Sequence, residues 1–371
     1  MTAIVVASAR TAFATCMLAL GAASTAYADN AYWHGTRNSN WHHGVQGALS
    51  NWYAKPPFAT ENTPLPPPTD GAIFSPRARQ HAVVVTRDVA IDEMLFTPGD
   101  FYPGAGQYGI GVARLATLKL KGRGLINQSG VPPAILVVDR GSFRLGNQAR
   151  IRSGNGLRTP IVIRGGDLDL RDRSNGGDAT VSNTHNGARF GLVVLDNRAS
   201  AGNMIIENAG RAVTAFFDHS TAGDADLRNS YDFSYPRAAR IDFTLTSGPA
   251  GDRTLTAGSI VNDYGAVQIG RNQITILRNF TQGDNGTLEV EVTRDASGQI
   301  AGGLRVRGVA RIGGTLIVRT SNARIGRHLL LRGAGSLIGT FSKVRYLDLA
   351  ATLKGRIVVS GSDVILFIER K

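Results

Sequence analysis

The sequence predicts an all-β protein, a single right-handed parallel β-helix (a solenoid) with an N-terminal cap rich in tryptophan and proline. Short Val/Ile/Leu runs alternate with polar residues at a period of two and are separated by Gly, Asn and Asp, the signature of strands and tight turns. Glycine accounts for 45 of the 371 residues, and no amphipathic helical pattern of any length is present. A turn-and-strand repeat in the middle of the chain indicates a solenoid.

The repeat has the pattern G-[DN]-x-x-[VIL]-x-N and occurs at residues 177–183, 202–208 and 223–229. One copy cannot bury its apolar side alone, so we expect the copies to stack and to pair their backbones along a common axis. Their trailing residues would then form an amide ladder at one corner, built from Asn183, Asn208 and Asn229. The alternative is that Gly-Asp and Gly-Asn are turn signals without a repeat.

Residues 1–28 are predicted to be a signal peptide. Arg10 precedes an uncharged stretch rich in small side chains, which ends in an Ala-Tyr-Ala sequence suited to cleavage between Ala28 and Asp29. A membrane anchor is the less favoured interpretation, because the stretch is short and rich in Ala, Ser and Thr. The mature chain is therefore expected to be exported without a transmembrane span. The single cysteine, Cys16, would leave with the signal, so no disulfide is expected.

Residues 29–80 are predicted to form a cap or linker before a β-helix at 81–371. They hold all three tryptophans and a dense run of prolines, which cannot form central strands because proline lacks the ladder N–H. Large indole rings need a surface to pack against, and the first exposed edge of a stack supplies one. A second interpretation is that sugar rings stack on these side chains, which makes them candidate ligand-binding residues: Trp33, Trp41 and Trp52.

The C-terminal segment 286–371 carries a family resemblance. The runs "LRVRGVARIGGTLIVRT", "IGRHLLLRGAGSLIGTFSKV" and "LKGRIVVSGSDVILFIER" resemble the C-terminal passenger segment of type V autotransporters, and the tryptophan-bearing start resembles the start of such passengers. The resemblance implies a surface-exposed or released β-helix, secreted with the help of an outer-membrane barrel. No such translocator barrel is recognisable before Lys371, so we expect a separately encoded translocator, a lost one, or a periplasmic protein.

The charge is strongly basic, with a formal net charge of +13 that comes almost entirely from arginine. We expect a structural or adhesive protein of the cell surface, outer membrane or medium that contacts polysaccharide or a host surface. A basic module for anionic polysaccharide or lipopolysaccharide is an alternative, with Arg305, Arg307 and Arg311 as candidate ligand-binding residues. Specific nucleic-acid binding is not predicted, because the sequence offers neither a recognition helix nor an aromatic stacking platform.

Outward charges in this region are also expected to pair between stacked strands. A shift of sixteen residues places Leu288 on Leu304 and sets Glu289 against Arg305, with Glu291 against Arg307. By the same logic, Arg150 and Arg152 precede Asp167 and Asp169. Much of the arginine would then balance neighbouring carboxylates.

The enzymatic alternative is a β-helix polysaccharide lyase or hydrolase. Asp167 and Asp169 lie on one predicted strand face, about 6.5–7 Å apart by strand rise, and are the candidate acid and base. The competing interpretation, which we favour, is that they are solvated and paired with arginines. No G-x-S-x-G occurs. Neither a cofactor nor a metal is predicted. The histidines His34, His42 and His43 lie in one segment, but His42 and His43 are adjacent, and adjacent side chains on an extended chain point apart, which makes a poor metal site.

Overall fold

The computed structural model describes residues 30–43, 50–57, 59–60, 62–99, 106–233, 235, 239–294, 300–320, 323–333 and 335–371. The predicted signal peptide and its cleavage site, Ala28 and Asp29, lie outside these residues. The described chain is all-β, and its helical content is one 3-10 turn, η1 (Gly154–Gly156). No helix in these ranges is long and apolar enough to cross a membrane.

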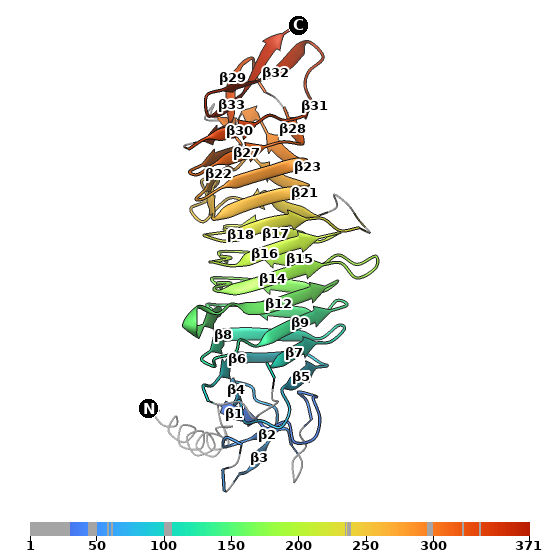
Figure 1. Ribbon diagram of the computed structural model, residues 1–371, viewed down its shortest axis with the longest axis vertical. Coiled ribbons are helices and arrows are strands. Elements are labelled where there is room, and N and C mark those ends of the chain that lie inside the picture. Colours follow the sequence, from blue (N-terminus) through green and yellow to red (C-terminus); the bar gives the residue numbers. More distant parts are fainter. Residues whose placement is uncertain are drawn as a thin grey trace, which may run out of the picture.

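Most strands pair in parallel with a strand from the next turn of the chain, so that the molecule is an elongated stack with its two ends far apart (Figure 1). The first column of paired strands runs unbroken along the stack. It consists of β5 (Ala82–Val85), β7 (Gly109–Val112), β9 (Ala134–Val138), β12 (Thr159–Arg164), β14 (Ala179–Thr184), β16 (Ile205–Ala209), β18 (Asp226–Ser230), the first parts of β21 (Ser259–Gly270) and β23 (Phe280–Glu291), β27 (Ala310–Ile312) and β30 (Leu337–Gly339).

A second column is equally continuous. It contains the first parts of β6 (Val89–Phe96) and β8 (Thr117–Asn127), then β10 (Ser142–Leu145), β13 (Asp167–Leu170), β15 (Leu192–Leu195), β17 (Val213–Asp218), β19 (Arg240–Thr246), the later parts of β21 and β23, β28 (Thr315–Arg319) and β31 (Lys343–Leu347).

The remaining strands form a third column and the two ends. The third column joins β1 (Asn30–Trp33), β4 (Gly71–Phe74), the ends of β6 and β8, and β11 (Arg150–Ser153). A separate sheet near the C-terminus contains β20 (Thr254–Ala257), β22 (Gln273–Ile276), β26 (Gly303–Val306) and β29 (Gly326–Gly333), and closes antiparallel through β33 (Asp363–Arg370) and β32 (Leu353–Ser360). Short antiparallel pairs are β2 (Trp52–Tyr53) with β3 (Pro64–Leu65) and β24 (Thr293–Arg294) with β25 (Ile300–Ala301).

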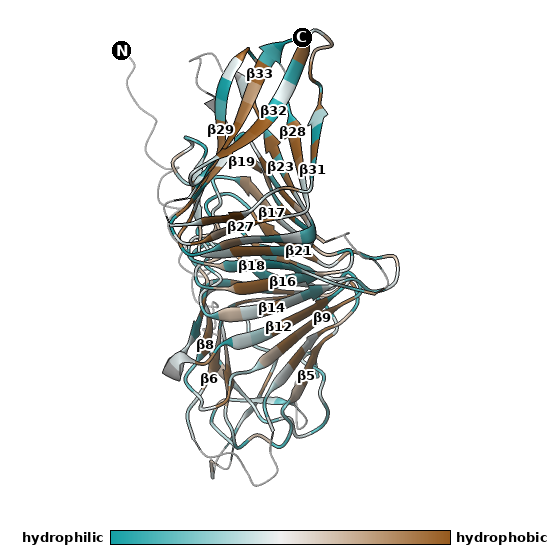
Figure 2. Ribbon diagram, turned by 45° about the horizontal axis from the view of Figure 1, so that its top comes forward, coloured by the Kyte–Doolittle hydropathy of each residue, from teal (hydrophilic) through white to brown (hydrophobic). Residues whose placement is uncertain are grey.

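The core runs through the stack because alternate side chains of every column point inward. Leu118, Phe143, Leu168 and Val193 occupy equivalent places on successive turns, and all are fully buried. Figure 2 shows these apolar strand segments in brown along the whole length. The period-two pattern of the sequence therefore identified the buried side chains correctly. The prediction of an all-β chain with long, mostly parallel sheets is also confirmed.

The repeat is confirmed as a set of stacked equivalent positions. Its strands pair in register, which places Asn183 beside Asn208 and Asn208 beside Asn229. Each amide Nδ2 donates to the next Oδ1, at 2.8 and 3.2 Å, and Asn229 donates to Asn262 at 3.0 Å. We call these four buried residues the asparagine ladder. Asn262 lies in the equivalent strand β21, which no Gly-Asp or Gly-Asn pair precedes at the spacing of the repeat, so the sequence pattern did not reveal it.

The tryptophans close the N-terminal end of the core. Trp33, Trp41 and Trp52 are buried, with the Trp52 ring centroid 5.0 Å from that of Trp33 and 4.8 Å from that of Trp41. They pack over Phe74, which stacks on Phe96 of the next turn at 4.7 Å. Parallel pairing already begins with β1 and β4, inside the segment predicted as a cap. The stack therefore extends N-terminal of residue 81.

The register expected for the C-terminal charges is wrong. Leu288 pairs with Leu316, not with Leu304, because one turn of the stack requires more residues than the sixteen assumed. Glu289 forms its ion pair with Arg319, and Glu291 binds Arg271 at 2.8 Å. The expected partners lie elsewhere: Arg305 belongs to the other sheet, between Thr275 and Arg332.

Candidate functional site

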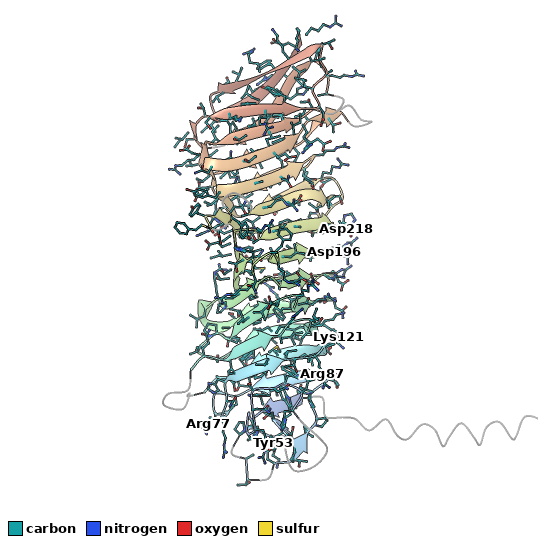
Figure 3. All side chains as sticks on the ribbon, turned by 90° about the vertical axis from the view of Figure 1, so that its right-hand side faces the viewer. Tyr53, Arg77, Arg87, Lys121, Asp196 and Asp218 are labelled. Carbon is teal, nitrogen blue, oxygen red and sulfur yellow. The ribbon has the colours of Figure 1, made fainter. Side chains whose placement is uncertain are left out.

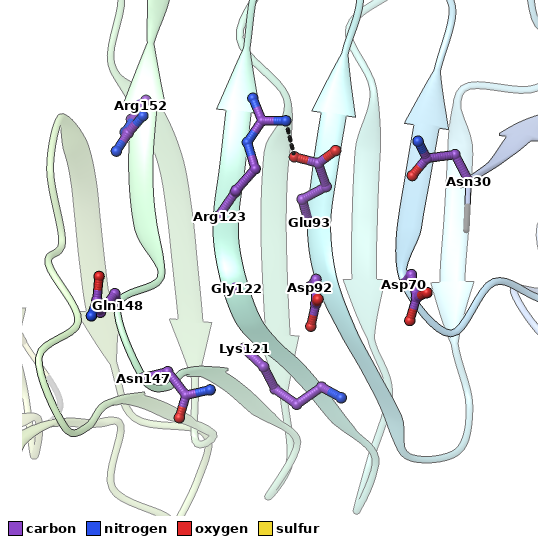
Figure 4. Close-up of a pocket in the computed structure, with 10 residues that line it drawn as sticks. All are labelled: Asn30, Asp70, Asp92, Glu93, Lys121, Gly122, Arg123, Asn147, Gln148 and Arg152. Atoms are coloured by element: carbon purple, nitrogen blue, oxygen red, sulfur yellow. Dashed lines mark ion pairs between the residues drawn. The ribbon is translucent and has the colours of Figure 1, made fainter.

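A polar groove crosses the N-terminal turns at the bends of β6 and β8, between the second and third columns. It encloses about 610 Å³ and mixes both signs of charge (Figure 4). Its lining comes from successive turns of the chain: Asn30, Asp70, Asp92, Glu93, Lys121, Gly122, Arg123, Asn147, Gln148 and Arg152.

Backbone geometry makes the groove. The N–H groups of Asp92 and Glu93 both donate to the carbonyl of Asp70, at 2.6 and 3.1 Å, which bends β6 over the preceding turn. Gly124 bends β8 with a positive φ of 87°, and a Cβ there would lie 2.3 Å from the Arg150 carbonyl oxygen. A Cβ on Gly122 would come within 2.9 Å of the Asp92 Cβ, so the lack of a side chain at this position leaves space in the groove.

The charged groups of the groove are partly paired. Glu93, only 8 % exposed, forms an ion pair with Arg123 at 3.1 Å. In Figure 4, Asp70, just before β4, and Asp92 of β6 lie on neighbouring turns, and the Lys121 side chain extends below Asp92. Such a surface offers hydrogen-bond donors and acceptors to a polar ligand. The sequence carries a signal for it: apolar alternation changes phase at Asp92–Glu93 in "VAIDEMLF" and again after Lys121.

Asp167 and Asp169 share the outward face of β13, as predicted, but their partners differ from those expected. Asp169 is 6 % exposed and binds Arg144 at 2.8 Å, with Arg171 at 3.6 Å. Burial raises the pKa of the Asp167 carboxyl above its ordinary value, and the charge of Asp169 raises it further. One carboxyl is thus paired with an arginine, while the pKa of its neighbour is raised.

The arginines expected beside these carboxylates are on another column. Arg150 pairs in register with Gly124, and Arg152 pairs with Ile126. The expectation paired residues that are too close in sequence. Arg144 and Asp169, which are neighbours across one turn, are 25 residues apart.

The arginines predicted as ligand-binding are all exposed. Arg305 lies on β26, and Arg311 lies on β27 in the first column, between Thr281 and Ile338. Arg307 occupies the bend between the two strands. Arg305 and Arg311 therefore belong to different sheets, and their ligand-binding role stays a prediction.

The tryptophan and histidine side chains of the N-terminal segment have structural contacts. The tryptophans have exposed fractions of 0–1 %, so no ring face is accessible for a sugar, and their proposed ligand role is corrected to packing. His34 contacts the Lys55 carbonyl at 2.9 Å. Burial lowers the pKa of His34 and of His42. No group of three or more metal-ligating side chains occurs among the described residues.

A set of exposed aromatic side chains was missed in the sequence. Phe233 is 90 % exposed, Phe190 56 % and Tyr231 43 %. They lie at the bends between the first and second columns, together with one arginine. We call this set the aromatic corner: Phe190, Arg211, Tyr231, Phe233, Tyr235 and Tyr264. Only stacking brings them together, since they span 75 residues of sequence from 190 to 264.

Comparison with known proteins adds no assignment to these sites. No family model matches the chain, and no curated protein matches it. The function is therefore argued from geometry.

Proposed function

We propose that this chain is an exported right-handed parallel β-helix, similar to an autotransporter passenger, with a structural and adhesive role at the cell surface or in the medium. The observation that carries the proposal is the unbroken parallel pairing of the first column from β5 to β30. Backbone bonding of this kind makes a stiff rod whose long sides are available for contacts.

Other features support the same proposal. The described chain begins at one end of the stack and finishes at the other, so a rod held at one end extends its side surfaces away from that point (Figure 1). Side chains cover its flanks along the whole length (Figure 3). The one cysteine, Cys16, lies in the predicted signal, and a chain that folds without disulfides suits passage across an outer membrane in an unfolded state. The net charge of +13 favours contact with anionic polysaccharide, lipopolysaccharide or host surfaces.

The test is to express the full chain in a bacterial host with an outer membrane, with and without a co-expressed translocator. We expect cleavage before Asp29, export from the cytoplasm, and salt-sensitive retention of the purified protein on immobilised polysaccharide. An uncleaved chain confined to the cytoplasm would refute export, and a purified protein that adheres to no polysaccharide or cell surface would refute the adhesive role.

A carbohydrate-active β-helix enzyme is the second candidate, favoured by the raised pKa of Asp167 beside the arginine-bound Asp169. In polysaccharide cleavage, a carboxyl with a raised pKa beside a second carboxyl serves as the general acid. Incubation with acidic and neutral polysaccharides, followed by measurement of polymer length, tests this candidate. Shortening that is lost in both Asp167→Asn and Asp169→Asn would establish it, and unchanged polymer length with the wild type would exclude it for those substrates.

A further inference from the structure

We propose that the aromatic corner is a binding site for an acidic polysaccharide, with sugar rings on its exposed aromatic faces and a sugar carboxylate on Arg211. This inference rests on the proposed adhesive function and gives it a ligand class and a location. The corner lies at loops 185–191 and 210–212, at residues 231–233 and 235, and at the bend of β21. All of these follow strands of the first column.

The asparagine ladder fixes the base of these loops. Besides bonding to one another, its amides donate Nδ2–H bonds across the bend to carbonyls of the second column. The acceptors are Val213 for Asn183 at 3.0 Å, Arg240 for Asn208 at 3.2 Å, Ala266 for Asn229 at 3.0 Å and Thr287 for Asn262 at 3.0 Å. Each loop therefore leaves and re-enters the stack at a fixed point, which places the aromatic side chains of successive turns beside one another.

Arg211 is held between two rings. Its guanidinium carbon lies 5.3 Å from the centroid of Phe190 and 4.7 Å from that of Tyr235. The edge of His185 contacts Tyr235 at 4.6 Å, and the Tyr235 N–H donates to Asp232 at 3.2 Å. Cation–π stacking orients the flat faces of a guanidinium and directs its N–H donors outward from the edge, the geometry that a carboxylate binds.

The loops that carry this arginine are closely packed. Gly210, with a φ of 64°, precedes Arg211, and a Cβ there would lie 2.3 Å from the Nδ1 of His185. Only a residue without a side chain lets the two loops approach this closely. Gly210 therefore lets the His185 ring lie directly against the backbone that leads into Arg211.

The aromatic faces continue along the stack axis. Tyr231 contacts Phe233 at 4.9 Å and Tyr264, on the next turn, at 4.7 Å. Phe233 is 90 % exposed, a costly arrangement for a phenyl ring unless something covers it. Aromatic faces accept the apolar C–H faces of pyranose rings, and aromatic side chains on successive turns offer more than one such contact to a linear polymer.

Charge selects the occupant. The protein carries a net charge of +13, and an arginine lies at the centre of the aromatic set, so a polyanion is attracted. A second copy of this chain would bring the same positive charge to the contact, and an uncharged polymer would form no ion pair with the guanidinium. A uronate-containing polysaccharide can stack its sugar rings on the aromatic side chains and form an ion pair between its carboxylate and Arg211.

The experiment measures binding of oligogalacturonate and of neutral dextran to the full chain by calorimetry. Phe233→Ala should weaken oligogalacturonate binding about three- to tenfold, because it removes one stacking face. Arg211→Gln should weaken it similarly and reduce its dependence on salt, with a smaller effect on dextran. The matched controls are Leu115→Ala, a 64 % exposed apolar side chain on another turn, and Arg87→Gln near the N-terminal end (Figure 3). Both controls should bind as the wild type does.

Each result decides the question. If the wild type binds oligogalacturonate and all four variants bind equally well, the inference is overturned while the adhesive function stands. If the wild type binds no acidic polysaccharide but still adheres to cells, this ligand class is wrong. If Phe233→Ala abolishes self-association in sedimentation and leaves sugar binding unchanged, the corner is a contact between copies of this chain. Near-identical thermal unfolding of wild type and variants confirms that folding is intact.

Discussion

At the residue scale, the asparagine ladder shows how a fully buried polar group is accommodated. Asn208 accepts from Asn183 at 2.8 Å and from the Thr214 hydroxyl at 2.9 Å, and it donates to Asn229 and to the Arg240 carbonyl. All of its hydrogen-bonding capacity lies within the bend. Burial of the Asn208 amide is tolerated because each of its donors and acceptors has a hydrogen-bond partner.

Asn208→Ala should lower the free energy of unfolding by about 2–4 kcal/mol, since it leaves several buried partners unsatisfied and opens a small cavity. The measurement is equilibrium denaturation in urea. Asn203→Ala is the matched control, because Asn203 is exposed on the same turn, and it should change stability by less than about 0.5 kcal/mol. Equal losses in the two variants would contradict a structural role for the ladder.

Asp167 makes stability depend on pH in a direction opposite to most carboxylates. Its folded-state pKa lies above the ordinary value because of burial and the neighbouring Asp169, so the folded protein binds a proton more readily than the unfolded chain. Stability attributable to this group therefore falls as pH rises from the unfolded pKa through the folded one.

Asp167→Asn should remove that dependence. The stability of the variant relative to the wild type is expected to increase with pH across this interval and to stay constant above it, as measured by thermal unfolding in a buffer series. Asp252→Asn is a control of opposite sign, because hydrogen bonds from Thr254 lower the pKa of the exposed Asp252 carboxyl. A variant at 167 whose relative stability decreases with pH would show that the carboxylate form is the favoured one.

At the element scale, the repeat's turns depend on glycine where backbones of adjacent turns touch. Gly177 has a φ of 56°, and a Cβ there would lie 1.7 Å from the Ile151 carbonyl oxygen of the previous turn. Gly187 has the same φ of 56° but open space around it. Substitutions at Gly177 and Gly187 therefore distinguish two contributions to stability: the cost of a side chain in a left-handed conformation, and the cost of a steric clash between turns.

Gly187→Ala should cost about 1–2 kcal/mol, the penalty for a side chain in the left-handed region. Gly177→Ala should cost at least twice as much or prevent folding, because strand pairing must yield to the new methyl group. Denaturation midpoints of the two purified variants give the comparison. Equal costs would mean that adjacent turns are not in contact at Gly177.

Charges on the strands act between neighbouring turns. Arg144 with Asp169 and Arg271 with Glu291 are cross-turn pairs, at 2.8 Å each. The more exposed pair, Arg271 with Glu291, contributes about 0–1 kcal/mol, so its main effect is to keep register and to avoid like-charge contacts. Ion pairs between arginine and carboxylates on neighbouring turns thus occur, but nine arginines of the described residues take part in ion pairs, and the partners differ from those predicted.

At the scale of the whole molecule, local patterns predicted local structure well. Alternation located the strands, and the trailing asparagines located a corner, because both depend on residues within one turn. The partners of Glu289 and Asp169 were missed because register between turns depends on loop lengths that no local pattern contains. The aromatic corner was missed for the same reason, since its members are distant in sequence and become neighbours only through stacking. The sugar-binding role of Trp52 was wrong because burial at the end of the stack removes its ring from solvent.

Site-specific cross-linking tests the stacking of turns most directly. In a Cys16→Ser background the chain has no other cysteine, so an introduced pair can be followed without interference. Glu207 lies beside Arg228 on the adjacent turn, and Ser182 lies one further turn away on the other side of Glu207. Neighbouring strands are about 4.8 Å apart, within reach of a disulfide, whereas two turns span about 9.6 Å, beyond it. Under mild oxidation, Glu207→Cys with Arg228→Cys should form an intramolecular disulfide rapidly, and Ser182→Cys with Arg228→Cys should not. Failure of the first pair, or equal cross-linking of both, would contradict the claim that successive turns of this chain share backbone bonding along one axis.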